Sequence, residues 1–176
     1  MGLRPAKCYS WDSPAYTRIS NNPSDSYITG VPASKISHFD MGNLSGKFNT
    51  EVSVIAEDSI QIRHNALEAS RVVVHQTLDK NPGSTNYRFK IRVYPHHVMR
   101  ENVMASGAGA DRVQEGMRNS FGKPSGRAAR ITAGQKVLSI YINENEALLK
   151  RVKTILRTAL KKLPGSMKIV VKSIEE

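Results

Sequence analysis

Hydrophobic and polar positions alternate over several short segments of this chain of 176 residues. From residue 34 onward the alternation predicts strands at 36–40, 51–56 and 59–62. Two further strands are predicted within 127–142, on either side of Gly134, and a last one at 167–172. The strictest alternation lies at 87–93, where one face is apolar and the other cationic. Its apolar residues are Tyr87, Phe89, Ile91 and Val93, and its cations are Arg88, Lys90 and Arg92.

Two segments have the helical period instead. Asn65 followed by Glu68 has the spacing of a capping box and predicts a helix that ends before Asn81-Pro82-Gly83. Asn143 and Glu146 repeat this arrangement at the start of a second helix, which Pro164-Gly165 ends. The apolar stripe of that second helix consists of Leu148, Val152, Ile155, Leu156, Ala159 and Leu163.

The order of these elements predicts the fold class. Three strands, a helix, a strand, a long connection, two strands, a helix and a strand indicate one α+β domain over residues 1–176. We expect a mixed, mostly antiparallel sheet with the two helices packed on one face. Residues 1–34 are rich in proline and lack periodicity, so they predict an extended tail, and residues 103–122 predict a long glycine-rich loop.

The tail is unusual in its aromatic content. Trp11 and three tyrosines lie among Arg4, Lys7 and Arg18, although aromatic residues are only 6% of the chain. Aromatic rings interleaved with cations can stack on bases and meet phosphates, which is the chemistry of contacts with single-stranded RNA. The alternative is that the tail packs on the core of the protein itself.

Charge indicates an anionic partner. The chain carries 26 Lys and Arg against 15 Asp and Glu, a net charge of +11. Residues 88–136 hold ten basic and three acidic residues, and such an excess is self-repelling unless phosphates neutralise it. Arginine predominates in this segment, which suits bidentate recognition of phosphate. No apolar run approaches the length of a membrane span, and we expect no secretory signal at the N-terminus.

The spacing of candidate residues in this sequence does not match the motifs of enzymes and metal sites. Gly122-Lys123 lacks the other residues of a phosphate-binding loop, and Ser106 lacks the glycines of a nucleophile elbow. His96 and His97 are adjacent, so their side chains diverge, and the single Cys8 builds neither a disulfide nor a zinc cluster. Asp111 and Glu115 have the spacing of a carboxylate pair, but the nearby arginines make charge compensation the better interpretation. We therefore expect no catalytic residues, no metal and no cofactor.

Several blocks of sequence resemble a known family. They are Arg4-Pro5-Ala6-Lys7-Cys8-Tyr9, Tyr16-Thr17-Arg18, Tyr27-Ile28-Thr29-Gly30-Val31-Pro32, Phe39-Asp40-Met41-Gly42-Asn43 and the run from Ala108 to Pro124. In this order they resemble the archaeal and eukaryotic large-subunit ribosomal protein L-ten-e, the counterpart of bacterial L-sixteen. The chain lacks the basic C-terminal extension of eukaryotic members, which favours an archaeal source.

The resemblance implies a cytoplasmic, non-enzymatic protein of the large ribosomal subunit, without membrane contact or homo-oligomer. It implies binding to large-subunit rRNA near the central protuberance and the A-site tRNA cleft, contact with neighbouring ribosomal proteins and a role in late subunit assembly. The loop would point toward the peptidyl transferase centre and the acceptor ends of tRNA. The rRNA-binding residues expected are Arg4, Lys7, Arg18, Arg88, Lys90, Arg92, Arg100, Lys123, Arg127 and Arg130. The loop residues expected at tRNA and the peptidyl transferase centre are Ser106, Gly107, Gly109, Arg112, Gln114 and Arg118.

Two other functions remain open from the sequence. One is an RNA-processing or RNA-modifying enzyme that uses His96, His97 and Asp111, and the other is a free RNA-binding regulator outside the ribosome.

Overall fold

Eight strands and two helices make up the ordered body of the computed structural model, which describes residues 4–9, 13–17, 20, 22–102, 104, 107–109, 114, 116–143 and 145–174. The strands are β1 (Asp40–Gly42), β2 (Thr50–Ala56), β3 (Ile60–Arg63), β4 (Tyr87–Ile91), β5 (His97–Glu101), β6 (Lys123–Ile131), β7 (Lys136–Ile142) and β8 (Met167–Ser173). The helices are α1 (His64–Lys80) and α2 (Glu146–Leu160), with short 3-10 turns η1 (Ala6–Cys8) and η2 (Pro23–Asp25).

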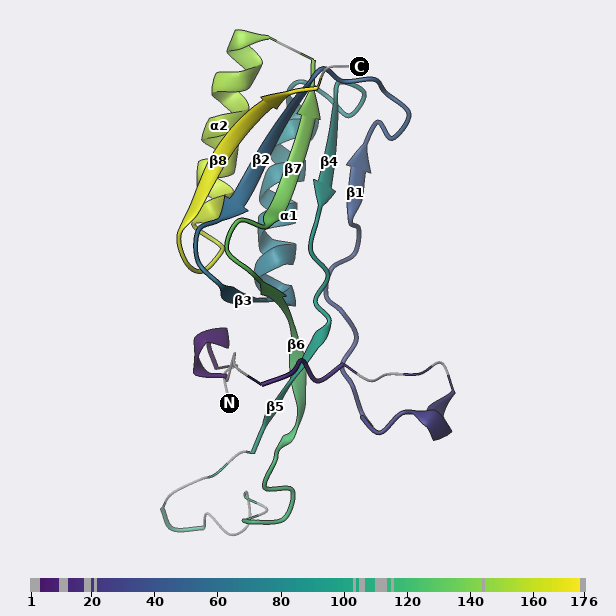
Figure 1. Ribbon diagram of the computed structural model, residues 1–176, viewed down its shortest axis with the longest axis vertical. Coiled ribbons are helices and arrows are strands. Elements are labelled where there is room, and N and C mark those ends of the chain that lie inside the picture. The colour runs from purple at the N-terminus through teal and green to yellow at the C-terminus, as the bar shows by residue number, and fades with distance from the viewer. Residues whose placement is uncertain are drawn as a thin grey trace.

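A five-stranded antiparallel sheet of order β1-β4-β7-β2-β8 forms the larger layer. Both helices cover the same face of this sheet (Figure 1). The alternation in β4 is confirmed, since Tyr87, Phe89 and Ile91 are buried toward the helices while Arg88 and Lys90 remain partly exposed. The apolar stripe of α2 is also confirmed, with Val152, Ile155, Leu156 and Ala159 buried. The predicted α+β class with two helices on one face is therefore confirmed.

A second sheet, of order β3-β6-β5, was not expected as a separate unit. It arises because β6 pairs with β3 and β5, whereas β7, the next strand in the chain, pairs with β2 and β4. Strand β5 has no sequence alternation to reveal it, because His97, Val98 and Met99 are buried consecutively. We call the β5–β6 pair the stem, since it projects from the helical body toward residues 102–122 (Figure 1).

Three predicted boundaries were wrong. The expected strand at 36–40 is β1 at Asp40–Gly42, because only these residues pair with β4. Helix α1 begins at His64 with extended Arg63 as its N-cap, so Asn65 lies inside the first turn. The N-cap of α2 is Asn145 rather than Asn143, and its side-chain oxygen accepts a hydrogen bond from the Ala147 N–H at 3.0 Å.

The N-terminal tail lies against the three-stranded sheet, as its path in Figure 1 shows. Ala6 is buried against Met99 and Ala128. The Gln61 side chain donates to the Tyr9 carbonyl at 3.1 Å, and the Val98 N–H donates to the Tyr16 carbonyl at 2.9 Å. The described part of the tail thus packs on the protein itself, which was the second of the two possibilities. Trp11 and Arg18 lie outside the described residues.

Candidate nucleic-acid interface

The face of the five-stranded sheet turned away from α1 and α2, here called the open face, gathers cations from three strands, β4, β7 and β8. Directly paired residues of antiparallel strands point to the same face, and the register places Arg88 opposite Tyr141, Tyr141 opposite Glu51 and Glu51 opposite Lys172. The cations of this face are Arg88, Lys90, Arg92, Lys136, Lys168 and Lys172. The face therefore presents a broad positive surface, and neither α1 nor α2 packs on it.

Two carboxylates hold the central cations of the open face in place. Asp40 lies 3.5 Å from both the Arg88 guanidinium and the Lys90 ammonium group. Glu51 is 7% exposed and binds the Lys136 ammonium group at 2.6 Å and Arg92 Nη2 at 3.3 Å. About a third of each of the Arg88, Lys90 and Arg92 side chains remains exposed, so these cations are positioned and still accessible to phosphate.

Glu51 is ionised at neutral pH in spite of its burial. Desolvation acts to raise the pKa of its carboxyl group, but the hydrogen bonds and charge of Lys136, with the hydrogen bonds of Ser139 and Arg92, outweigh it and lower the pKa. Ser139 Oγ donates to Glu51 Oε1 at 2.8 Å. The charge of Glu51 thus orders the centre of the open face, where the Arg92 guanidinium also bonds the Tyr141 hydroxyl.

The stem arginines that are expected to bind rRNA also hold the N-terminal tail against the stem. Arg100 stacks on the Tyr16 ring with 4.0 Å between the guanidinium carbon and the ring centroid. Arg127 Nε donates to the Pro32 carbonyl at 2.8 Å, and Arg130 Nη1 donates to the Ser13 carbonyl. A guanidinium has five N–H donors, so a contact with the tail leaves donors for another partner. Lys123 lies exposed at the loop end of the stem.

His97 anchors the tail from inside the stem. It is 8% exposed, and its Nδ1 accepts a hydrogen bond from the Tyr16 N–H at 3.0 Å. Desolvation, with the charges of Arg130, His96 and Arg100, lowers its pKa from 6.5 to about 4. A neutral, buried imidazole that accepts a backbone N–H has a structural role in this position.

The loop at the end of the stem exposes apolar side chains. Met117 is 80% exposed and Phe121 is 83% exposed. Gly107, Gly109 and Arg118 are exposed and Gln114 is partly exposed, whereas Ser106 and Arg112 lie outside the described residues. Asn102 Nδ2 donates to the Gly116 carbonyl at 3.3 Å.

The loop returns to the stem through a position that requires glycine. Gly122 has φ +84°, and a Cβ atom there would lie 2.6 Å from the Glu101 carbonyl carbon. Beside it, a pocket of about 760 Å³ lies between the tail and the stem, and its lining includes Tyr16, Tyr27, Arg100 and Phe121. Aromatic rings next to cations in a pocket of this size can hold an unstacked base.

The two described tail cations lie near the same sheet. Arg4 Nε lies 3.1 Å from Glu101 Oε1 at the end of β5, and its side chain is 65% exposed. Lys7 is exposed on η1. The structure thus places the predicted cations on two neighbouring regions, the open face and the stem with its tail, rather than at one point.

Comparison with known proteins identifies the family. The family model described as ribosomal protein L16p/L10e matches residues 12–170. The chain belongs to this family. The large ribosomal subunit protein uL16 of Methanococcus aeolicus is 47% identical over 97% of this chain and 95% of its own length. The proteins of the same name from Staphylothermus marinus and Archaeoglobus fulgidus are 46% and 42% identical, over 99% and 100% of this chain and 97% of their own lengths.

Membership of the L16p/L10e family confirms the resemblance inferred from the sequence, including its archaeal character. The family consists of structural ribosomal proteins and not of enzymes. Among the described residues, no three His, Cys, Asp or Glu side chains lie together as metal ligands would. No helix within the described part of the chain has the length and hydrophobicity needed to cross a bilayer.

Sequence analysis missed part of the open face of this L16p/L10e member. Lys136, Tyr141, Lys168 and Lys172 join the cations of β4 only through the strand register. The alternation of lysine with apolar residues in 167–172 was a signal that β8 has a cationic face. It does not indicate that β8 is separated from β4 by β7 and β2, so the common surface needed the three-dimensional structure.

Proposed function

We propose that this protein is a structural constituent of the large ribosomal subunit in the cytoplasm, where it binds large-subunit rRNA near the central protuberance and the A-site tRNA cleft. The observation that carries the proposal is the match, over nearly the full length, to proteins named large ribosomal subunit protein uL16. The open face and the stem supply the cations that rRNA phosphates require. The protein also contacts neighbouring ribosomal proteins in this proposal.

In this proposal the surfaces have different tasks. Arg88, Lys90 and Arg92 bind the phosphate backbone from the open face, and Arg100, Lys123, Arg127 and Arg130 bind it from the stem. Arg4, Lys7 and Arg18 contact rRNA from the tail. The loop points toward the peptidyl transferase centre and tRNA acceptor ends through Ser106, Gly107, Gly109, Arg112, Gln114 and Arg118. The protein positions RNA, supports late subunit assembly and performs no chemistry of its own.

Sedimentation tests the proposal directly. The full chain, tagged and expressed in an archaeal host, is expected to sediment with the large subunit at one copy per subunit and to stay there through a high-salt wash. Small-subunit fractions serve as the control. A pool that sediments only as free protein would contradict residence in the ribosome and would favour a free RNA-binding regulator.

Deleting residues 105–114 tests whether the loop contributes to function without contributing to the stability of the fold. Gly107, Ala108 and Gly109 are exposed and belong to neither core cluster, so we expect the melting temperature to change by less than about 2 °C. The same deletion is expected to slow tRNA accommodation or subunit maturation, measured in subunits that carry the variant. Replacing residues 105–114 by a Gly-Ser segment of equal length is the control for loop length. A large fall in melting temperature would contradict the separation of loop and fold.

A further inference from the structure

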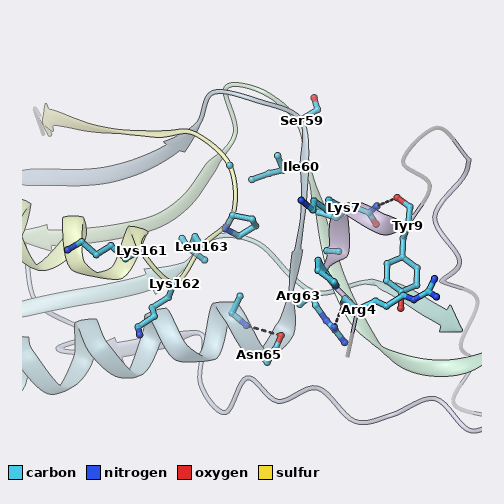
Figure 2. A pocket seen from close by; sticks show the side chains of 16 residues that line it. Arg4, Lys7, Tyr9, Ser59, Ile60, Arg63, Asn65, Lys161, Lys162 and Leu163 are labelled. Atoms are coloured by element: carbon cyan, nitrogen blue, oxygen red, sulfur yellow. Dashed lines mark hydrogen bonds between the residues drawn. The ribbon is translucent and has the colours of Figure 1, made fainter. Parts of the chain in front are cut away.

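A second pocket lies next to η1, and no described residue of the loop lines it. It has a volume of about 760 Å³ and is formed where η1, the junction of β3 with α1 and the chain after α2 meet. Figure 2 shows Lys161 and Lys162 on one side of it, Arg4 and Lys7 on the other, and Ile60 and Leu163 between them. Residues from three distant parts of the sequence therefore surround one cavity.

The floor of this pocket is apolar. Leu163, Pro164 and Gly165 pass close to Ile60, and a Cβ atom on Gly165 would lie 3.1 Å from the Ile60 side chain. Gly165 has φ +74°, a conformation that favours glycine. Ala66, in the first turn of α1, and half-buried Tyr9 complete the apolar lining. A flat, largely apolar ligand fits such a floor.

The rim of the pocket is cationic. Its sixteen lining residues include Arg4, Lys7, Arg63, Lys161 and Lys162 and contain no Asp or Glu. Arg4 is partly neutralised by Glu101, whose carboxylate lies outside the lining. Lys161 and Lys162 are exposed at the C-terminal end of α2. Such a rim selects an anion and discriminates against a neutral apolar ligand.

Arg63 adds a buried positive charge to the wall. It is 7% exposed, and its Nη1 donates to the Arg4 carbonyl. Its Nε and Nη2 have no hydrogen-bond partner among the described residues, and none of the described acidic side chains forms an ion pair with it. A buried cation without a counter-ion is costly, so an anion in the adjacent pocket lowers the electrostatic energy of this region.

We propose that this pocket binds one unstacked nucleotide of the rRNA, with its base on the apolar floor and its phosphates on Lys161, Lys162 and Lys7. The inference rests on the proposed function and adds a site to it. An apolar cavity with a cationic rim combines the two requirements for holding a base removed from its stack, which are burial of the ring and neutralisation of the flanking phosphates. The cavity shares no described lining residue with the aromatic pocket beside the loop.

Pocket variants of the full chain test the inference by their affinity for a large-subunit rRNA transcript. The double variant Lys161→Gln and Lys162→Gln is expected to bind about 30-fold more weakly at 0.1 M salt, because two phosphate contacts are lost. Ala66→Phe, which fills the cavity without changing charge, is expected to bind more weakly by a similar factor. The matched control is Lys150→Gln with Lys153→Gln, exposed on the same helix and away from the pocket. Melting temperatures establish that each variant is folded.

The site of contact is read from crosslinks. Transcripts containing 4-thiouridine or 6-thioguanosine are irradiated in the complex, and crosslinked peptides that contain Tyr9 or residues 163–165 are expected. Affinities of both pocket variants within twofold of the control would overturn the inference while leaving rRNA binding intact. Absence of crosslinks at these peptides in the bound transcript would also overturn it, since no base would then lie in the pocket. Failure of the unaltered protein to bind the transcript would instead overturn the proposed function as well.

Discussion

Replacing Arg88, Lys90 and Arg92 together by glutamine will weaken binding to a large-subunit rRNA transcript by about 10²-fold at 0.1 M salt. Each phosphate contact contributes roughly 0.7–0.9 to the slope of log affinity against log salt. Relative to 1 M salt, three contacts therefore raise the affinity at 0.1 M salt by about two to three powers of ten. The three side chains, two on β4 and Arg92 just after it, lie on the open face and are about one-third exposed, which allows them to bind phosphate together. Titrations at several salt concentrations measure both the affinity and the slope.

The unaltered protein sets the reference for this experiment. If it makes 6–10 phosphate contacts, its affinity is expected to fall roughly 10³–10⁵-fold between 50 and 200 mM salt, by analogy with DNA. The triple variant is expected to reduce the slope by about two to three. Its loss of ion pairs with Asp40 and Glu51 lowers stability too, so the melting temperature of each variant is measured in parallel.

A matched control distinguishes the effect of the open face on affinity from the effect of a lower net charge. Arg151, Lys153 and Arg157 are exposed on α2, which covers the opposite face of the sheet (Figure 1), and they comprise the same residue types as the triple on β4. Replacing them by glutamine changes net charge by the same amount and is expected to alter affinity by less than about fivefold. Equal losses for the two triple variants would contradict the assignment of the open face as an rRNA surface.

Strand β4 could be predicted from the sequence because each of its two faces has a uniform environment. The open face is solvated and the other face is packed, so Arg88 and Lys90 differ in environment from Tyr87 and Phe89 residue by residue. The same holds for α2, where Val152 and Leu156 mark the buried stripe. Local periodicity reports local burial, and it therefore identified these elements together with the cations that they carry.

Two features of the interface could not be predicted from local periodicity because they depend on contacts between residues that are distant in the sequence. His97, Val98 and Met99 are buried in succession, and the tail contacts all three: Ala6 packs on Met99, and the Tyr16 backbone bonds His97 and Val98, so β5 shows no period of two. Arg100, Arg127 and Arg130 were predicted as contacts with RNA, but the sequence does not indicate that they also bind Tyr16, Pro32 and Ser13. The same guanidinium groups hold the tail and carry the charge that, in the proposed function, attracts rRNA.

The hydrogen bond from the Tyr16 N–H to buried His97 makes the stability of the protein sensitive to acid. Stability is expected to fall as the pH is lowered from about 6.5 to about 4, because the unfolded chain takes up a proton at His97 and the folded protein does not. The folded pKa lies below the unfolded value, so the stabilisation is complete above pH 6.5 and is lost progressively below it. The difference between the two pKa values corresponds to a loss on the order of 3 kcal/mol across this range. Urea unfolding at pH 7.5, 5.5 and 4.5 measures it.

Substitution isolates the contribution of His97 to this acid sensitivity. His97→Gln retains an acceptor for the Tyr16 N–H but does not titrate, so its stability is expected to depend less on pH than that of the unaltered protein. Buried His64, whose pKa is also lowered by desolvation and by nearby Lys35, Arg63 and Arg127, contributes in the same direction and remains in both proteins. His38→Gln, at an exposed histidine, is the control for replacing an imidazole by an amide. Parallel loss of stability by His97→Gln and the unaltered protein below pH 6.5 would contradict coupling of the tail to pH through this imidazole.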